Sequence, residues 1–309
     1  MRLVRRLRCV WIPLAALASL CLALVVACRA PQPEGRVVFE GESAFGRVRV
    51  VERADGLRSL YTGDGDARQS AVYPGRPGHL ELAYTRVATV GLALAPPDGR
   101  ILFVGLGGGA MPMYARAVLP EARIDVVEID PLVVEVARSH FDFRPDARMA
   151  VHTGDGRAFI ESAPPASYDL VVLDAFSDDD IPFALTTWQF LRAVRARLAP
   201  GGAVVSNLWS SAREYEPMLA TYDSVFGDVH VVRVGRRSQR IVVAAPDRGR
   251  LGRATLIRAS RELAGRAELG FDLPALVAEG YERPPERRVP VLDDSQGGPA
   301  AGAGVRQRK

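Results

Sequence analysis

Short, nearly all-apolar runs alternate with stretches of helical periodicity through the middle of the chain. The runs have the length of strands buried on both faces, and they lie at 101–104, 124–127, 149–152, 170–173 and 203–206. Amphipathic spacing fills the gaps, at 111–118, 131–140, 158–161 and 187–198. Apolar strands joined by helices form parallel sheets. The pattern predicts an α/β fold, a doubly wound and mostly parallel sheet within residues 98–290.

The chain on either side of this region is patterned differently. Brief alternating runs broken by Gly and Asp lie at 36–39, 46–52 and 57–61. A helix is predicted at 80–94, so we expect residues 37–95 to form a small subdomain of β-hairpins and a helix. Later elements are two strands at 230–234 and 240–245, a helix at 256–264 and a disordered tail at 295–309.

The first 28 residues have the order of a targeting segment. Arginines precede the apolar stretch 10–27, which ends at Val25-Val26-Ala27-Cys28. This box resembles a bacterial lipoprotein signal peptide, in which Cys28 is lipidated. An uncleaved membrane anchor is the alternative, because the stretch is at the short end of what spans a bilayer. Both make residues 29–36 a linker and place the folded part on the periplasmic side of the cell envelope, whereas a misassigned start codon leaves it in the cytoplasm.

Charge and cysteine usage exclude several classes of function. The chain has 40 basic and 36 acidic residues, and four of the basic ones are arginines at 2, 5, 6 and 8, so 36 remain against 36. This balance argues against a nucleic-acid partner. All three cysteines lie in residues 1–28, and the four histidines lack metal-binding spacing. We therefore expect neither a disulfide framework nor a metal site.

A glycine loop follows the first strand of the predicted parallel sheet. It reads Gly105-Leu106-Gly107-Gly108-Gly109. Such a loop permits a tight turn and close approach of a ligand to the backbone, with a helix N-terminus just beyond. Glycines after strands also occur for packing reasons, so the loop alone is a weak signal.

Carboxylates follow the next three strands of the predicted sheet. Glu128 stands 21 positions after Gly107, where an acid can accept both hydroxyls of a ribose, although a solvated acid at a strand end is the alternative. Asp155 lies on a glycine-flanked turn and could instead cap a helix. Asp174 ends the fourth strand. Because parallel strands end at one edge, these features together predict a nucleoside site.

The motifs at these strand ends resemble those of spermidine synthases, the polyamine aminopropyltransferases, and their spermidine-synthase-like relatives. The resemblance covers residues 45–235, and it implies a Rossmann-like sheet of the class I methyltransferase type. Its most specific motifs are V-E-I-D at 127–130, G-D-G at 154–156, Y-D-L-V-V-L-D at 168–174 and A-P-G-G at 199–202.

The resemblance also implies roles for individual residues. Glu128 matches the glutamate that holds the ribose, Asp155 and Gly156 match the pair at the adenine end, and Asp174 matches the proton acceptor. Gln69 and Tyr84 match residues from the small domain and helix that cover the site. The implied substrates are decarboxylated S-adenosylmethionine, or S-adenosylmethionine itself, and an amine acceptor, with no metal.

Several positions depart from the family pattern. The family loop G-G-G-D-G uses its aspartate to grip the donor's amine, but this chain has Leu106 and Gly108 at the second and fourth positions. The family's D-S-S-D appears as Asp174-Ala175-Phe176-Ser177, and the second acid is absent unless one of Asp178, Asp179 and Asp180 reaches back. Arg86 stands where the family has glutamate and would repel a polyamine if it faced the site.

Three hypotheses follow from the sequence. Aminopropyl transfer is favoured by the overall resemblance. Methyl transfer needs the same nucleoside site, although common methyltransferases carry an acid where this chain has Phe103. A noncatalytic nucleoside- or polyamine-binding lipoprotein is favoured by the missing acids and by the predicted export, since adenosyl sulfonium donors are made in the cytoplasm.

Overall fold

The computed structural model describes residues 35–63, 65, 67–176, 181–247, 249–283 and 289–297. The predicted signal segment with Cys28, residues 29–34 of the linker, Asp178 to Asp180, and residues 298–309 of the predicted tail lie outside the described residues. Within the described ranges, no helix is long and apolar enough to cross a bilayer.

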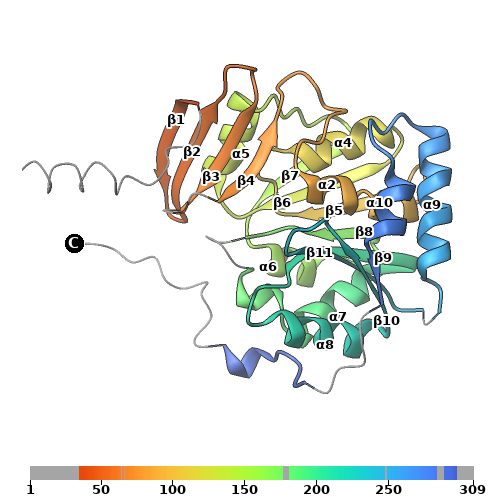
Figure 1. Cartoon of the computed structure of the whole chain (residues 1–309). Coiled ribbons are helices and arrows are strands. Elements are labelled where there is room, and N and C mark those ends of the chain that lie inside the picture. Colours follow the sequence, from red (N-terminus) through yellow and green to blue (C-terminus); the bar gives the residue numbers. More distant parts are fainter. Residues whose placement is uncertain are drawn as a thin grey trace, which may run out of the picture. The chain divides into compact units, whose positions relative to one another are not determined.

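The main sheet of the described chain has eight strands, in the order β12-β10-β11-β9-β8-β5-β6-β7. Parallel pairing joins β9 (Leu198–Trp209), β8 (Tyr168–Leu173), β5 (Arg100–Val104), β6 (Arg123–Glu128) and β7 (Met149–Thr153). Antiparallel pairing adds β11 (Gln239–Ala245), β10 (Asp228–Arg233) and β12 (Tyr281–Glu282). The arrangement in Figure 1 confirms the predicted α/β fold, and its strand order reverses at β5.

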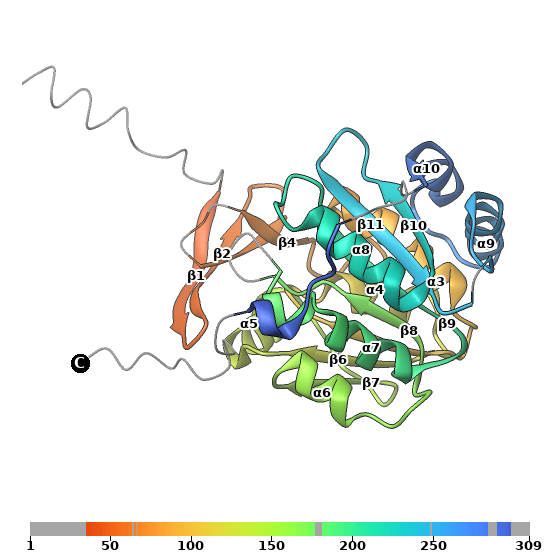
Figure 2. The same ribbon diagram turned by 90° about the horizontal axis from the view of Figure 1, so that it is seen from below.

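Helices cover both faces of this sheet (Figure 2). One face carries α2 (Ala83–Ala88), α3 (Val90–Leu94), α4 (Ala110–Val118), α5 (Pro131–His140), α9 (Arg253–Arg266) and α10 (Leu273–Gly280). The other carries α6 (Gly156–Ser162), α7 (Trp188–Arg197) and α8 (Tyr215–Phe226). Alternate residues of β5 enter different cores: Phe103 packs in the first, and Leu102 and Val104 pack in the second. Burial on both faces explains why the strands read as continuous apolar runs.

A second sheet precedes the main one along the chain. It is an antiparallel meander of β1 (Arg36–Ser43), β2 (Gly46–Glu52), β3 (Arg58–Thr62) and β4 (Arg68–Val72). Two contacts tie it to α5: Ser43 donates to Asp130 Oδ2 at 2.6 Å, and Arg58 donates to the His140 carbonyl at 2.6 Å. The sequence indicated the first three strands but not β4, which opens with polar residues.

Other elements differ from their predicted extent. The helix predicted at 80–94 is two shorter helices, α2 and α3, which meet at Thr89. β9 extends well beyond the predicted 203–206 on both sides. Helices α8 and α10 were not predicted.

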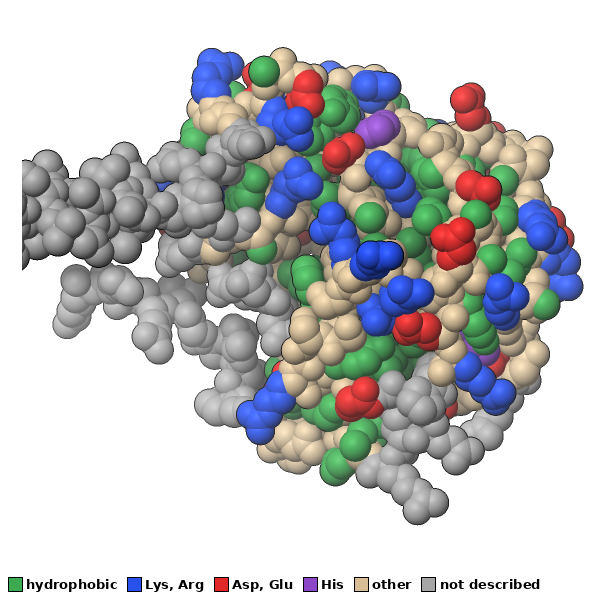
Figure 3. Space-filling view, in the orientation of Figure 1, with side chains coloured by type: hydrophobic (Ala, Val, Ile, Leu, Met, Phe, Trp, Pro, Cys, Tyr) green, Lys and Arg blue, Asp and Glu red, His purple; other side chains and the backbone are tan. Residues whose placement is uncertain are grey.

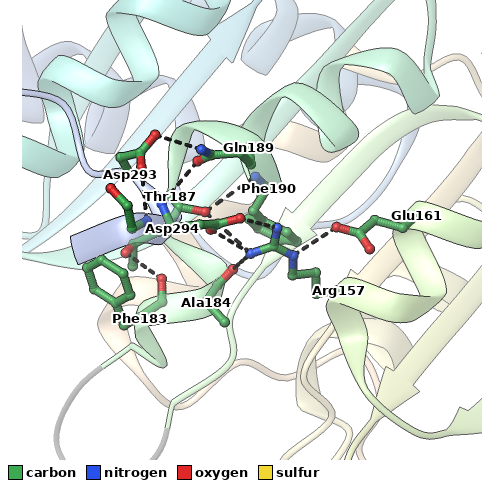
Figure 4. A network of polar contacts seen from close by, with 11 residues as sticks. Arg157, Glu161, Phe183, Ala184, Thr187, Gln189, Phe190, Asp293 and Asp294 are labelled. Carbon is green, nitrogen blue, oxygen red and sulfur yellow. Dashed lines mark hydrogen bonds and ion pairs between the residues drawn. The ribbon is translucent and has the colours of Figure 1, made fainter. Parts of the chain in front are cut away.

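The C-terminal segment 289–297 is held against α6 and α7 (Figure 4). Arg157 at the start of α6 makes a bidentate pair with Asp294 at 2.8 and 2.7 Å, and its Nε donates to Glu161 at 2.8 Å. Gln189 of α7 donates to Asp293 at 2.6 Å. Asp294–Gln296 form a short 3-10 turn, so residues 295–297 of the predicted tail are ordered by these contacts.

Candidate active site

The carboxyl ends of β5, β6, β7 and β8 are joined by backbone hydrogen bonds just beyond the strands. Gly105 N donates to Val127 O, Gly154 N donates to Glu128 O, and Asp174 N donates to Val104 O, each at 2.9 Å. These bonds bring the glycine loop and the acids of the sequence motifs to one edge. The glycine loop and these acids therefore lie at one edge of the sheet, as predicted.

The glycine loop is closely packed. Gly105 and Gly109 have φ values of +100° and +78°, which disfavour any residue with a side chain. A Cβ at Gly105 would lie 2.4 Å from the Asp174 carbonyl oxygen, and one at Gly109 would lie 2.5 Å from Phe143. Gly107 also has a positive φ, of +53°. Packing thus accounts for part of the glycine pattern, and the loop leads directly into the N-terminus of α4.

Glu128 lies at the end of β6 and holds the loop by its side chain. Its Oε2 accepts from Leu106 N at 2.9 Å, and its Oε1 accepts from Asp130 N at 3.0 Å. Burial raises the pKa of Glu128, and the backbone donors oppose that rise. Each carboxylate oxygen can accept more than one hydrogen bond, so the geometry is compatible with the predicted ribose contact.

Asp155 is exposed and caps α6, with its Oδ1 accepting from Ala158 N at 2.8 Å. This confirms the helix-cap interpretation of Asp155, and the adenine contact stays a prediction. Gly156 follows at the first position of the helix. A Cβ there would lie 2.6 Å from Val104, so the residue is needed for close packing of α6 on β5.

Asp174 is the centre of a small polar cluster. Tyr84 of α2 donates to its Oδ2 at 3.0 Å, and Asn207 of β9 donates to its Oδ1 at 3.3 Å. Burial raises the pKa of Asp174 to about 6, and the two donors oppose that rise. Burial, together with the nearby Asp174 carboxylate, also raises the pKa of Tyr84 well above its usual value. The structure therefore brings Tyr84, which the resemblance assigns to a helix that covers the site, into contact with Asp174.

Asn207 was missed by the sequence reasoning. The available signal was a pair of polar residues, Ser206 and Asn207, near the end of an apolar run and followed by leucine and tryptophan. That signal does not show which partner the side chain meets, because the contact with Asp174 joins strands 33 positions apart.

Gln69 lies on strand β4, and its role at the site stays a prediction. Its neighbour Ser70 is buried, and a Cβ at Gly108 would lie 2.9 Å from Ser70 Oγ and 3.0 Å from Phe141. The space where the family's loop aspartate would begin is thus already filled. The Arg86 side chain folds back on the segment before α2, where it donates to the carbonyls of Leu80 at 2.6 Å and Glu81 at 3.2 Å.

Basic side chains gather over the middle of the face seen in Figure 3. Exposed arginines stand on two neighbouring loops after β9 and β10, with Arg213 on one and Arg236 and Arg237 on the other. Ser210 N donates to Ser238 O at 2.8 Å and holds these loops together. Both loops lie at the same edge of the sheet as Asn207, which is near the end of β9. Among the described residues, no cluster of acids or histidines is arranged to hold a metal ion.

Comparison with known proteins identifies the family. A model of the spermine/spermidine synthase domain matches residues 82–232. The polyamine aminopropyltransferase of Vibrio vulnificus is 33% identical over 214 residues, which are 68% of this chain and 72% of that protein. The chain belongs to the spermine/spermidine synthase family. A probable spermidine synthase from Corynebacterium glutamicum, at 24% identity and a TM-score of 0.64, has the same fold over 83% of this chain and 98% of its own.

Methyltransferases also match this family member, over a smaller part. The mouse eEF1A lysine and N-terminal methyltransferase is 37% identical over 145 residues, which are 43% of this chain but only 21% of that protein. The crystal structure of human methyltransferase-like protein 13 in complex with SAH, at 29% identity, covers 60% of this chain and 92% of its own with a TM-score of 0.54. The fold is therefore the class I methyltransferase type, and the longer match is to the aminopropyltransferases.

Proposed function

We propose that this protein transfers an aminopropyl group from decarboxylated S-adenosylmethionine to an amine. The observation that carries the proposal is the Asp174 carboxylate, held by Tyr84 and Asn207 at the end of β8. The family supports the class of donor, and relatives named as polyamine aminopropyltransferases match over most of their own length. The nucleoside is proposed to lie along the glycine loop, with its ribose at Glu128 and its adenine beside Asp155.

The chemistry needs orientation and one proton acceptor. The amine nitrogen attacks the carbon bonded to the sulfonium, a C–N bond forms, and the C–S bond breaks with its electron pair leaving on a neutral thioether. Because the amine enters as an ammonium, it must give one proton to a carboxylate oxygen of Asp174 before its lone pair can attack. Because the pKa of Asp174 is about 6, the side chain is ionised near neutral pH and can accept it. Electrostatic attraction of the sulfonium is the alternative role for this carboxylate.

Methyl transfer from S-adenosylmethionine is the second candidate, and the glycine loop favours it. An aspartate at position 108 would repel the carboxylate that S-adenosylmethionine retains and its decarboxylated relative lacks. Here Gly108 faces Ser70 and Phe141, so that discrimination is missing. The match to methyltransferases agrees with this reading, but it is shorter than the match to the aminopropyltransferases.

The two donors give different products, which a single assay separates. The protein is incubated with a diamine and either donor, and the thioether is identified by mass. We expect methylthioadenosine from the decarboxylated donor. S-adenosylhomocysteine formed from S-adenosylmethionine, with no methylthioadenosine from the decarboxylated donor, would assign methyl transfer, and binding of a nucleoside without turnover would favour the noncatalytic hypothesis.

The role of Asp174 is tested by Asp174→Asn. We expect turnover to fall by about 100-fold or more, the usual contribution of a positioned base, while calorimetric affinity for methylthioadenosine persists. Unchanged turnover would remove the proton-acceptor role. Asp98→Asn, an exposed change in the turn before β5, is the matched control.

A further inference from the structure

Asn207 has one polar atom that its contact with Asp174 does not use. A carboxylate can only accept hydrogen bonds, so the amide nitrogen is the atom turned toward Asp174 Oδ1, at 3.3 Å. The amide oxygen is buried and has no hydrogen-bond partner among the described residues. Only 4% of the Asn207 surface is exposed. Buried acceptors without a donor are rare in folded proteins, so this atom points to a donor that arrives from outside.

The position of Asn207 in the sheet places this oxygen in the active-site layer. Asn207 pairs with Ile241 of β11 and shares a strand face with Val205. Val205 lies directly under Gly91 of α3, so this face of β9 looks toward α2 and α3. Tyr84 comes from the same layer. Asp174, Tyr84 and Asn207 therefore meet in one layer although they come from three different parts of the chain.

The distances allow one nitrogen to meet both residues. The oxygen and nitrogen of an amide group lie about 2.3 Å apart, given ordinary C=O and C–N bond lengths. The amide nitrogen is 3.3 Å from Asp174 Oδ1. The distance from the amide oxygen to that carboxylate oxygen is therefore at most the sum of these two distances. A charge-assisted N–H···O bond is about 2.8 Å long, so an ammonium group between the two oxygens can bond to both.

We propose that the side-chain oxygen of Asn207 accepts a hydrogen bond from the reacting amine of the acceptor. This inference rests on the proposed transfer reaction. One N–H of the amine points to Asp174 and a second points to Asn207, and the proton that leaves passes to Asp174. The nitrogen lone pair is then free to face the electrophilic carbon of the donor.

Asn207 thus fills a role that the family's motif gives to a second acid. The chain carries Ala175, Phe176 and Ser177 after Asp174, where D-S-S-D would supply another carboxylate. An amide oxygen accepts from an ammonium without adding charge. A second carboxylate at this distance would raise the pKa of Asp174 by repulsion, and an amide avoids that effect.

Two substitutions separate the two atoms of the amide. Asn207→Leu removes both the donor and the acceptor at similar size, whereas Asn207→Asp keeps an acceptor and removes the donor. We expect the Leu variant to raise the KM for the amine about 10- to 100-fold, the range for hydrogen bonds to charged groups, with the KM for the donor unchanged. The Asp variant should have an amine KM at or below that of the unmodified protein.

The controls keep this proposal distinct from the proposed function. Ser260→Ala removes a buried hydroxyl that bonds within α9 and should change neither KM. If the unmodified protein transfers the group and the Leu variant keeps its amine KM, the role of Asn207 is wrong and the function stands. If the unmodified protein neither binds nor modifies an amine, both fall. Should the Leu variant lose methylthioadenosine binding through misfolding, a large rise in the amine KM of the Asp variant overturns the proposal.

Discussion

At the scale of single residues, Asp174 is placed where function and stability oppose each other. A proton acceptor must be ionised at the working pH, but burial favours the neutral form and raises the pKa of Asp174 to about 6. Tyr84 and Asn207 each donate one hydrogen bond to the charged form and limit the rise. Ionising the buried Asp174 therefore costs free energy. An ammonium that binds beside the carboxylate lowers this cost, which is useful in an active site.

The first prediction concerns the stability of Asp174→Asn. The pKa of Asp174 is raised on folding from 3.8 to about 6, so the unmodified protein loses stability as the pH rises through this window. The Asn variant lacks this loss, and Asn207 can rotate so that its oxygen accepts from the new amide. We expect the variant to be more stable by about 1–2 kcal/mol at pH 8, allowing for residual solvent contact, and equal at pH 4. Urea unfolding at both pH values measures this, and a variant less stable at pH 8 would contradict it.

The second prediction concerns the pH dependence of turnover. The acid limb of kcat/KM should fall near pH 6, where Asp174 becomes protonated. Tyr84→Phe removes a donor that lowers the pKa of Asp174, so the limb should move to higher pH by up to about one unit. Tyr61→Phe, in the small sheet, serves as the control. An acid limb that stays in place in Tyr84→Phe would show that Tyr84 does not act on Asp174.

At the scale of elements, the site depends on strand ends that are fastened to one another. The loop after β5 is bonded to the ends of β6 and β8, and Asp155 caps α6 directly after β7. Behind this edge, Arg157 links the first turn of α6 to Asp294 and to the Ala184 carbonyl (Figure 4). Arg157 is only two positions from Asp155. The C-terminal segment 289–297 therefore supports the helix whose first turn is predicted to meet the adenine.

The third prediction uses Arg157→Gln to test whether the contacts of Arg157 hold the C-terminal segment in place. Losing the bidentate pair should cost about 1 kcal/mol of unfolding free energy, since both side chains are partly exposed. The Arg157 guanidinium holds the pKa of Asp294 below its usual range, so the difference between the two proteins should shrink as the pH falls below that range. Amide hydrogen exchange should quicken in residues 289–297. Arg258→Gln, which removes an exposed ion pair on α9, is the control. Equal exchange of residues 289–297 in both variants would show that Arg157 does not hold this segment.

At the scale of the whole molecule, two sheets cooperate in one compact unit that starts at Gly35. The small sheet places Ser70 of β4 against the glycine loop and is tied to α5 through Asp130 and His140. The large sheet supplies Glu128 beside the glycine loop and the polar cluster of Asp174 and Asn207. Helix α2, which carries Tyr84, lies in the connection between the two sheets.

The fourth prediction concerns the segment before this unit. We propose that residues 1–28 are a lipoprotein signal and that Cys28 is lipidated, because a basic, apolar and small-residue order precedes the cysteine. Labelled palmitate should be incorporated by the full chain and not by Cys28→Ala. Cys21→Ala, a change inside the apolar stretch, should keep the label. Equal labelling of the full chain and Cys28→Ala would rule the lipoprotein hypothesis out and leave an anchor or a cytoplasmic protein.

The pattern of the sequence was enough to predict the α/β fold, most strands and helices, and the edge of the sheet at which the glycine loop and the acids gather. Strands buried on both faces must be apolar along their whole length, and the ends of parallel strands must meet at one edge. Both constraints can be recognised in short stretches of sequence. The pattern was therefore enough to single out Gly105, Glu128, Asp155 and Asp174. Polar edge elements such as β4 gave no such signal.

The surroundings of Asp174, in contrast, follow from the packing of distant parts of the chain. Tyr84 meets Asp174 across 90 positions of chain, and Asn207 meets it across 33. The same holds for Arg157 and Asp294, which are 137 positions apart. Contacts of this kind depend on how helices and strands pack, and no periodicity records them. A polar side chain in an apolar run shows that it needs a partner, and the fold alone decides which partner it has.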